Sequence, residues 1–345
     1  MFAELAGFQK RGSEVRLLAP AESEIFRRAQ AAGIPAVPFQ TGKWQFPFEA
    51  IRFARWLRRN RIQILNTHSS RDGWLLGIAG RLARVPFIVR TRHIDVTYPN
   101  RWLSRHAYTT FADHVLVTSA KIKAHFQEMF GLPDDRISTV PTGIDLEMYS
   151  PAGGKAKFAD EPFALCPLIG MISVLRSWKG HVTFLQAARI LLDGKFVARF
   201  VIVGDGPMRP HIEKQIADLN LGETVTLTGH QEDVPEILRA LQALVIASTR
   251  HEGIPQIGLQ ALATKTPVVG SNVGGIPEII RHGKTGRIFP AGDAKALAAA
   301  IRETLREIAA TEKMAEAGRK LVETHHSLEK MFGDLESIYR RHLPA

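Results

Sequence analysis

A carboxylate and an amide stand on either side of an expected helix start in the stretch STRHEGIPQIGLQALATKTPVVGS, residues 248–271. The first N–H groups of a helix have no partner within the helix and lie at the positive end of its dipole, so they can hold a phosphate or sugar oxygen. Glu252 can accept hydrogen bonds from sugar hydroxyls, and Gln260, two turns into the helix, can reach further hydroxyls. The alternative is a glutamate that only complements the helix dipole. The backbone available to a ligand is that of Gly253, Ile254, Pro255 and Gln256.

A second candidate for chemistry is the loop SVLRSWKGH, residues 173–181, which follows an apolar run. It sets the fork-shaped cation of Arg176 three residues before the point charge of Lys179. Such a pair suits a diphosphate, whose negative charge must be neutralised when it departs. The pattern fits two solvated surface cations equally well.

Two weaker signals also lie at the ends of expected strands. The turn VIVGDGP contains Gly204 but lacks the third glycine of a dinucleotide-binding fingerprint, so an ordinary strand-to-helix turn explains it equally well. His68 and His93 each end an apolar run, and ligands bind at the carboxyl ends of parallel strands. His93, with Arg90, Arg92 and Asp95 around it, is the better candidate of the two.

Metal and redox chemistry are not expected from this sequence. It contains no Asp-x-Asp, no helical His-x-x-x-His pair and one cysteine, Cys166. We therefore expect no metal and no other cofactor. A single cysteine also excludes an internal disulfide and fits a reducing compartment, so the expected location is cytoplasmic.

The elements that must position these residues alternate between apolar strands and helices along the 345-residue chain. Near-continuous Val/Ile/Leu strands separated by helices predict parallel sheets covered on both faces. The stretch SPAGGKAKFADEPF, residues 150–163, is the best linker. We expect an α/β protein with two doubly wound, Rossmann-like domains facing across a cleft. The expected bounds are 1–150, 151–325 and a final helix, 326–345, that returns to the first domain. The usual first strand and its glycine turn are missing before the first helix, which suggests a truncated or misassigned start.

The charge distribution points to an anionic partner. The net charge is +11, and residues 1–150 hold 21 Lys and Arg against 13 Asp and Glu. In residues 43–61 arginines alternate with aromatic and aliphatic side chains at helical spacing, as in helices that lie on anionic membranes. A surface helix that packs its aromatics on a sheet is the slightly favoured alternative. A peripheral association with the inner face of the cytoplasmic membrane is therefore a hypothesis, and no nucleic-acid partner is expected.

Taken together, these segments resemble the retaining, nucleotide-sugar-dependent glycosyltransferases of the family-four group, which have the GT-B fold. The residues that carry the resemblance are HEGIPQIGLQALATKTPVVGS, GGIPEIIRHGKTGRIFPAGD, the Arg176–Lys179 loop, VIVGDGP and VPTGIDLEMYSP. The resemblance covers nearly the whole chain. Gln260 departs from it, because the family has an acidic residue at this position.

The resemblance implies a role for each candidate. Arg176 and Lys179 would bind the donor diphosphate, Glu252 the donor sugar, and position 260 the nucleotide ribose. His93 matches the family's active-site histidine, and turns near Gly204 and Gly229 would flank the nucleotide. Glu252 and His93 are thus the expected catalytic residues.

The function implied is sugar transfer from a nucleotide-sugar donor to a saccharide or lipid-linked acceptor, with retention, in the synthesis of lipopolysaccharide or another envelope polysaccharide. Three alternatives stay open at this point: a nucleotide-sugar 2-epimerase, a nicotinamide oxidoreductase, which would need a complete glycine fingerprint, and a non-catalytic sugar-nucleotide-binding module.

Overall fold

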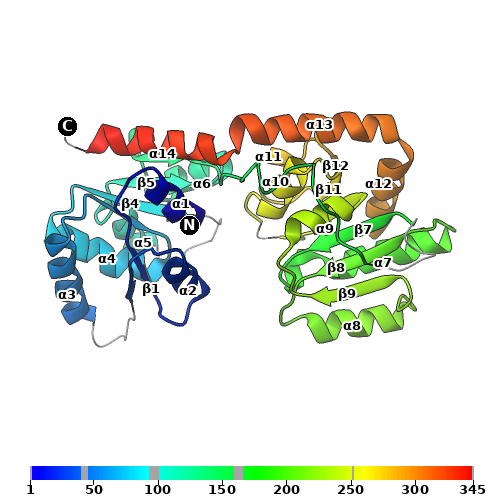
Figure 1. Ribbon diagram of the computed structural model, residues 1–345, viewed down its shortest axis with the longest axis horizontal. Coiled ribbons are helices and arrows are strands. Elements are labelled where there is room, and N and C mark those ends of the chain that lie inside the picture. The colour runs from blue at the N-terminus through cyan, green and yellow to red at the C-terminus, as the bar shows by residue number, and fades with distance from the viewer. Residues whose placement is uncertain (1, 40–45, 93–100, 159–165, 251, 344–345) are drawn as a thin grey trace. The chain divides into compact units, whose positions relative to one another are not determined.

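The computed structural model describes the chain except residues 1, 40–45, 93–100, 159–165, 251 and 344–345 (Figure 1). The chain forms two compact units. Unit 1 comprises residues 1–93, 97–140 and 329–345, and unit 2 comprises residues 94–96 and 141–328. The changeover lies at Val140–Pro141, whereas the sequence suggested residue 150.

Unit 1 contains two parallel sheets. The larger has the strand order β3-β4-β5-β6 and the smaller pairs β1 with β2. The strands are β1 (Leu17–Ala19), β2 (Ala36–Pro38), β3 (Ile64–Thr67), β4 (Phe87–Arg92), β5 (His114–Val117) and β6 (Ile137–Thr139). Every residue of β4 and β5 is buried, as expected for strands covered on both faces.

Helices cover the larger sheet of unit 1 on two sides. One side packs Leu65 and Ile88 against α3 and α4, and the other packs Phe87 and Val89 against α14 and Phe8 of α1. From Glu329 onward the final helix, α14, belongs to unit 1. In Figure 1 this helix is red, and the earlier elements of unit 1 run from blue to cyan. The helices are α1 (Phe2–Lys10), α2 (Glu24–Ala31), α3 (Phe46–Arg59), α4 (Ser70–Ala83), α5 (Arg101–Thr109), α6 (Ala120–Phe130) and α14 (Leu328–His342).

Unit 2 is built on one six-stranded parallel sheet with the order β12-β11-β10-β7-β8-β9. The chain starts in the middle at β7, adds two strands on one side and then three on the other, which is the strand order of a dinucleotide-binding Rossmann fold. The strands are β7 (Leu168–Ile172), β8 (Arg199–Val203), β9 (Val225–Gly229), β10 (Ala243–Ile246), β11 (Val268–Ser271) and β12 (Arg287–Phe289).

Two apolar cores, one centred on Phe184 and Phe200 and the other on Leu244 and Leu262, pack helices against this sheet. The helices are α7 (His181–Asp193), α8 (Arg209–Asp218), α9 (Val234–Ala240), α10 (Gln256–Ala263), α11 (Ile276–Ile279), α12 (Ala294–Arg306) and α13 (Ile308–His325). The chain therefore has the expected α/β architecture with parallel sheets.

Candidate functional site

The candidate site of unit 2 lies where the strand order of its sheet reverses. β7 and β10 are neighbours in this sheet, and the chain leaves them toward opposite sides. In open α/β sheets, the loops that leave such a pair at their carboxyl ends form the ligand-binding crevice. Here those loops are residues 173–180 and 247–255, which carry most of the residues that the sequence analysis selected.

An ion pair joins the two loops. Lys179 Nζ donates hydrogen bonds to Glu252 Oε1 at 3.0 Å and to Glu252 Oε2 at 2.8 Å. The Ser248 hydroxyl donates to Glu252 Oε2 at 2.5 Å. The side chains of Lys179 and Glu252 are 23% and 10% exposed, so the pair is largely withdrawn from water yet still accessible. A carboxylate that accepts three hydrogen bonds is held in one orientation.

Backbone contacts hold these loops in place. The hydroxyl of Ser271, at the end of β11, donates to the Ser248 carbonyl at 2.6 Å. The Thr249 amide donates to the Trp178 carbonyl at 2.7 Å, which ties the β10 loop to the Lys179 loop. Ser248 and Ser271 are both buried, so the hydrogen bond between them is protected from water and fixes the position of the residue that donates to the carboxylate.

Two glycines are needed for the loops to approach so closely. Gly180 has φ of +80°, and a Cβ there would lie 1.9 Å from the Ala247 carbonyl oxygen. Gly274 has φ of +58°, and a Cβ there would lie 1.9 Å from the Glu252 carbonyl oxygen. The segment GGIPE, noted in the sequence only as part of a family resemblance, thus supports the backbone of Glu252.

Of the predicted donor-binding residues, Lys179 and Glu252 are brought into direct contact, and Arg176 is not. Arg176 is exposed, and its guanidinium lies 5.9 Å from the centre of the Trp178 ring. Gly253, Ile254 and Pro255 lead from Glu252 to the first residue of α10, Gln256. The side chain of Gln260 is partly exposed. Within the described part of the chain, no other side chain is hydrogen bonded to the amide group at the end of this side chain.

The two predicted glycine turns lie together. The Gly204 amide donates to the Gly229 carbonyl at 2.8 Å, and a Cβ on Gly204 would lie 2.0 Å from the Ser173 carbonyl oxygen. The Leu175 amide donates to the Asp205 carbonyl at 3.0 Å. The Gly204 turn therefore packs directly on the loop that carries Arg176 and Lys179.

One residue of this region was not selected from the sequence. His181 begins α7, is buried, and its Nε2 lies 3.1 Å from the Ser173 hydroxyl. Burial lowers the pKa of His181 to about 4, and the nearby Lys179 charge acts in the same direction. The imidazole is therefore neutral at pH 7. Its position directly after the Lys-Gly pair was the only available sequence signal.

Two sequence expectations concern features outside this cluster. His93 lies outside the described residues, so its predicted role stays a prediction. Among the described residues, no three or more His, Cys, Asp or Glu side chains gather in a way that could hold a metal ion.

Two family models match consecutive parts of the chain. "Glycosyltransferase Family 4" matches residues 3–148, and "Glycosyl transferases group 1" matches residues 159–321. Together with the parallel sheets of both units and a polar site at the switch point of unit 2, these matches define the class as nucleotide-sugar glycosyltransferases of the GT-B fold. The chain belongs to this family.

Individual relatives agree with this assignment. The chain is 28% identical to an Escherichia coli UDP-Gal:alpha-D-GlcNAc-diphosphoundecaprenol alpha-1,3-galactosyltransferase, an alignment that covers 69% of this chain and 65% of the relative. It is 27% identical to the alpha-D-kanosaminyltransferase of Streptomyces kanamyceticus, with 83% of this chain and 81% of the relative covered.

Solved structures show the same fold. A glycosyltransferase from Rickettsia africae matches with a TM-score of 0.87 at 20% identity, over 98% of this chain and 93% of the other. The Anabaena protein HepE, solved in complex with UDP, matches with a TM-score of 0.83 at 17% identity, over 99% and 94% of the two chains.

Proposed function

We propose that this glycosyltransferase moves a sugar from a nucleotide-sugar donor to a saccharide or lipid-linked acceptor, with retained anomeric configuration. The observation that carries the proposal is the Lys179–Glu252–Ser248 cluster at the carboxyl ends of β7 and β10. In the proposed site Lys179 and Arg176 neutralise the donor diphosphate, and the backbone from Gly253 to Gln256 adds N–H donors.

Each proposed role follows from the chemistry of its group. A departing diphosphate develops negative charge, and a preorganised cation next to a helix start stabilises that charge without a metal. The Glu252 carboxylate is an acceptor for the hydroxyls of the transferred sugar. His93 remains the proposed active-site histidine of unit 1.

Sugar transfer and its stereochemistry test the proposal together. The protein is incubated with UDP-, GDP- and ADP-sugars and a panel of saccharide and polyprenyl-linked acceptors, and product anomers are assigned by NMR. We expect transfer with retention, and we expect it to persist in EDTA. Inversion would refute the proposed stereochemistry. Turnover lost in EDTA and restored by magnesium or manganese would refute metal independence. Isomerised free donor without transfer would favour an epimerase.

We further propose that the acceptor is presented at the cytoplasmic face of a membrane, in envelope polysaccharide or lipopolysaccharide synthesis. Helix α3 supports this. Its inner face is buried, but Phe48 is 77% exposed and Ile51 is 45% exposed. Arg55 and Arg59 are exposed on the same helix. Exposed apolar side chains beside exposed arginines are typical of a helix that lies on anionic lipid. The diphosphoundecaprenol in the name of the E. coli relative fits such an acceptor. None of the described helices combines the length and apolarity needed to cross a bilayer.

Vesicle co-sedimentation tests this second proposal. Each basic residue near an anionic surface contributes about 1 kcal/mol, so Arg55→Glu with Arg59→Glu should release the protein from anionic vesicles. The matched control, Lys10→Glu with Lys121→Glu, changes the charge of unit 1 equally at exposed positions elsewhere. Equal binding of the parent protein to neutral and anionic vesicles would argue for an acceptor in solution.

A further inference from the structure

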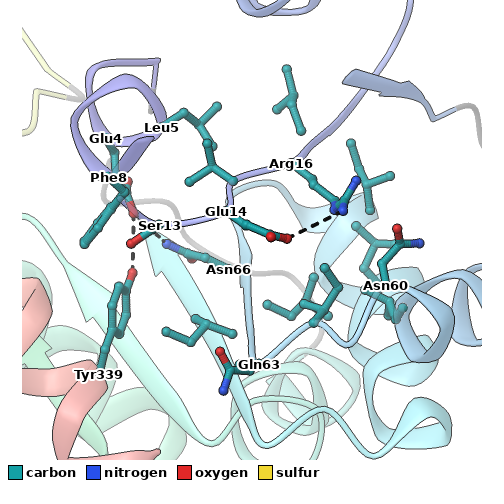
Figure 2. Close-up of a pocket in the computed structure, with 18 of the residues that line it drawn as sticks. Glu4, Leu5, Phe8, Ser13, Glu14, Arg16, Asn60, Gln63, Asn66 and Tyr339 are labelled. Carbon is teal, nitrogen blue, oxygen red and sulfur yellow. Dashed lines mark hydrogen bonds and ion pairs between the residues drawn. The ribbon is translucent and has the colours of Figure 1, made fainter. Parts of the chain in front are cut away.

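A polar cluster lies inside each unit. In unit 1, Glu4, Asn66 and Tyr339 converge, as Figure 2 shows. Asn66 Nδ2 donates to Glu4 Oε1 at 3.2 Å, and the Tyr339 hydroxyl lies 3.4 Å from the same oxygen, so this cluster ties α1 to β3 and α14. In unit 2 a polar cluster surrounds His181, and it borders the proposed diphosphate site.

His181 contacts two points of the loop that carries Arg176 and Lys179. It is the first residue of α7 and is only 3% exposed. Its Nε2 lies 3.1 Å from the hydroxyl oxygen of Ser173, the first residue of the loop. The ring is also hydrogen bonded to the backbone of Arg176, in the middle of the loop. One side chain therefore holds the loop 173–180 at two places.

The hydrogen bonds of His181 fix the tautomer of its ring. Burial, followed by the charge of Lys179, lowers the pKa of His181 to about 4, while the hydrogen bond to the Arg176 backbone acts in the opposite direction. A hydrogen bond that raises the pKa of an imidazole is one that the ring donates. The ring is neutral at pH 7 and has a single N–H, which is directed to Arg176. Nε2 is then the acceptor of the Ser173 hydroxyl.

The two structures that His181 joins are both fixed. The Ser173 amide donates to the Val203 carbonyl at 3.0 Å, which anchors the end of β7 on β8. Phe184 and Leu185, in the first turn of α7, are fully buried in the core of unit 2. The ring therefore connects the end of a strand to the start of a helix across the base of the loop, and Lys179 lies in the segment between them.

The position of Lys179 depends on the backbone that His181 holds. The Lys179 amide donates to the Arg176 carbonyl at 3.1 Å. A cation that is already in place stabilises developing charge without the cost of reorganisation. We propose that His181 is a positioning residue for the sugar transfer, and that its ring, through Ser173 and the Arg176 backbone, holds Lys179 where it meets the donor diphosphate. This role rests on the proposed function, which makes Lys179 the cation of the diphosphate site.

Nucleotide affinity after removal of the Ser173 hydroxyl tests this role. Ser173→Ala takes away one of the two contacts of the ring and leaves Lys179 and Arg176 in the chain. Calorimetric titration with UDP, GDP and ADP should show binding about threefold to tenfold weaker than in the parent, because one hydrogen bond is lost. Ser177→Ala is the matched control, since Ser177 is an exposed serine of the same loop, and its affinity should equal that of the parent. Equal affinity of Ser173→Ala and Ser177→Ala would overturn the proposal.

A double-mutant cycle with Lys179→Ala separates positioning from a general structural effect. If His181 and Ser173 act through Lys179, Ser173→Ala should change the affinity of Lys179→Ala by less than about twofold. An equal loss in both backgrounds would overturn the positioning role. If Lys179→Ala alone binds as the parent does, the proposed diphosphate site is wrong and the positioning role is wrong with it. If Lys179→Ala binds more weakly and Ser173→Ala does not, only the positioning role is wrong.

Substitutions of His181 itself complete the test. His181→Gln keeps a donor and an acceptor, and His181→Leu keeps neither, so the glutamine variant should retain more of the nucleotide affinity. Equal losses in the two variants would show that the hydrogen bonds of the ring do not matter, which would overturn the proposal. The ¹⁵N NMR spectrum of histidine-labelled protein at pH 7 should show His181 with its proton on Nδ1, assigned by the signal that His181→Gln lacks. A proton on Nε2 would overturn the proposed hydrogen bonds.

Discussion

Replacing Glu252 by glutamine should tighten nucleoside-diphosphate binding even as it lowers turnover. Lys179 donates to both oxygens of this carboxylate, so a diphosphate must compete for the same cation. Glutamine keeps the shape and an acceptor for Ser248 but removes the charge. The lysine is then free to meet the phosphates.

The magnitude follows from the exposure of the pair. A hydrogen bond to a charged group contributes about 1.5–3 kcal/mol, and the lower end applies because the Lys179 side chain is 23% exposed. A gain of about 1.5 kcal/mol corresponds to a Kd lowered roughly tenfold. Turnover should fall by more than this factor, because the proposed partner of Glu252 is the transferred sugar.

Calorimetric titration with UDP, GDP and ADP measures the first effect, and a transfer assay at saturating donor measures the second. Glu312→Gln is the matched control, since Glu312 is an exposed carboxylate on α13 of the same unit. An unchanged or weaker nucleotide affinity of Glu252→Gln would refute the idea that the carboxylate and the diphosphate share Lys179. Intact transfer would show that Glu252 only holds the loop.

Three further predictions concern the same unit. Gln260→Glu should tighten nucleotide binding by about 1 kcal/mol if position 260 contacts the ribose, because a charged acceptor replaces an amide; unchanged affinity in titration would exclude that contact. Gly274→Ala should lower the Tm and turnover more than Gly283→Ala. Both glycines have positive φ, but only a Cβ at position 274 would meet a backbone oxygen, the carbonyl oxygen of Glu252. Equal effects of the two substitutions in both assays would show that close packing of Gly274 on Glu252 does not matter. Burial lowers the pKa of His181 from 6.5 to about 4 in the folded protein, so the stability that its neutral form contributes is present above pH 6.5 and is lost as the pH falls toward 4, by at most about 3 kcal/mol. His181→Gln should flatten this decline of the unfolding free energy with pH, measured by urea unfolding. An unchanged pH dependence would contradict the lowered pKa of His181.

Much of the fold could be predicted because the strands of unit 2 are continuous apolar runs separated by helices. β2 (Ala36–Pro38) was not predicted. It is short, follows Pro35 and ends at Pro38, and prolines weaken the strand pattern. Helical spacing was predicted over residues 43–61, and the structure has α3 at Phe46–Arg59. This helix buries Phe53 and Leu57, as the packing alternative to membrane binding requires, while Phe48 stays exposed.

The sequence analysis selected Lys179 and Glu252 separately, but it did not predict the contact between them. Lys179 and Glu252 are 73 residues apart, and only the parallel pairing of β7 with β10 brings them together. Ser248 gave no sequence signal, since a serine after a strand is ordinary. Arg176 shares the loop of Lys179, yet its side chain lies over Trp178, a rotamer choice that residue spacing does not encode.

The most direct test of the central claim is nucleotide affinity after removal of the site's cation. Parent protein, Lys179→Ala and the exposed-lysine control Lys295→Ala are each titrated with UDP, GDP and ADP in the presence of EDTA. We predict that the parent and the control bind one nucleoside diphosphate with equal affinity and that Lys179→Ala binds it at least about tenfold more weakly, because a charge-assisted hydrogen bond is lost. Equal affinity in all three proteins would contradict the claim that the loops after β7 and β10 hold the donor diphosphate.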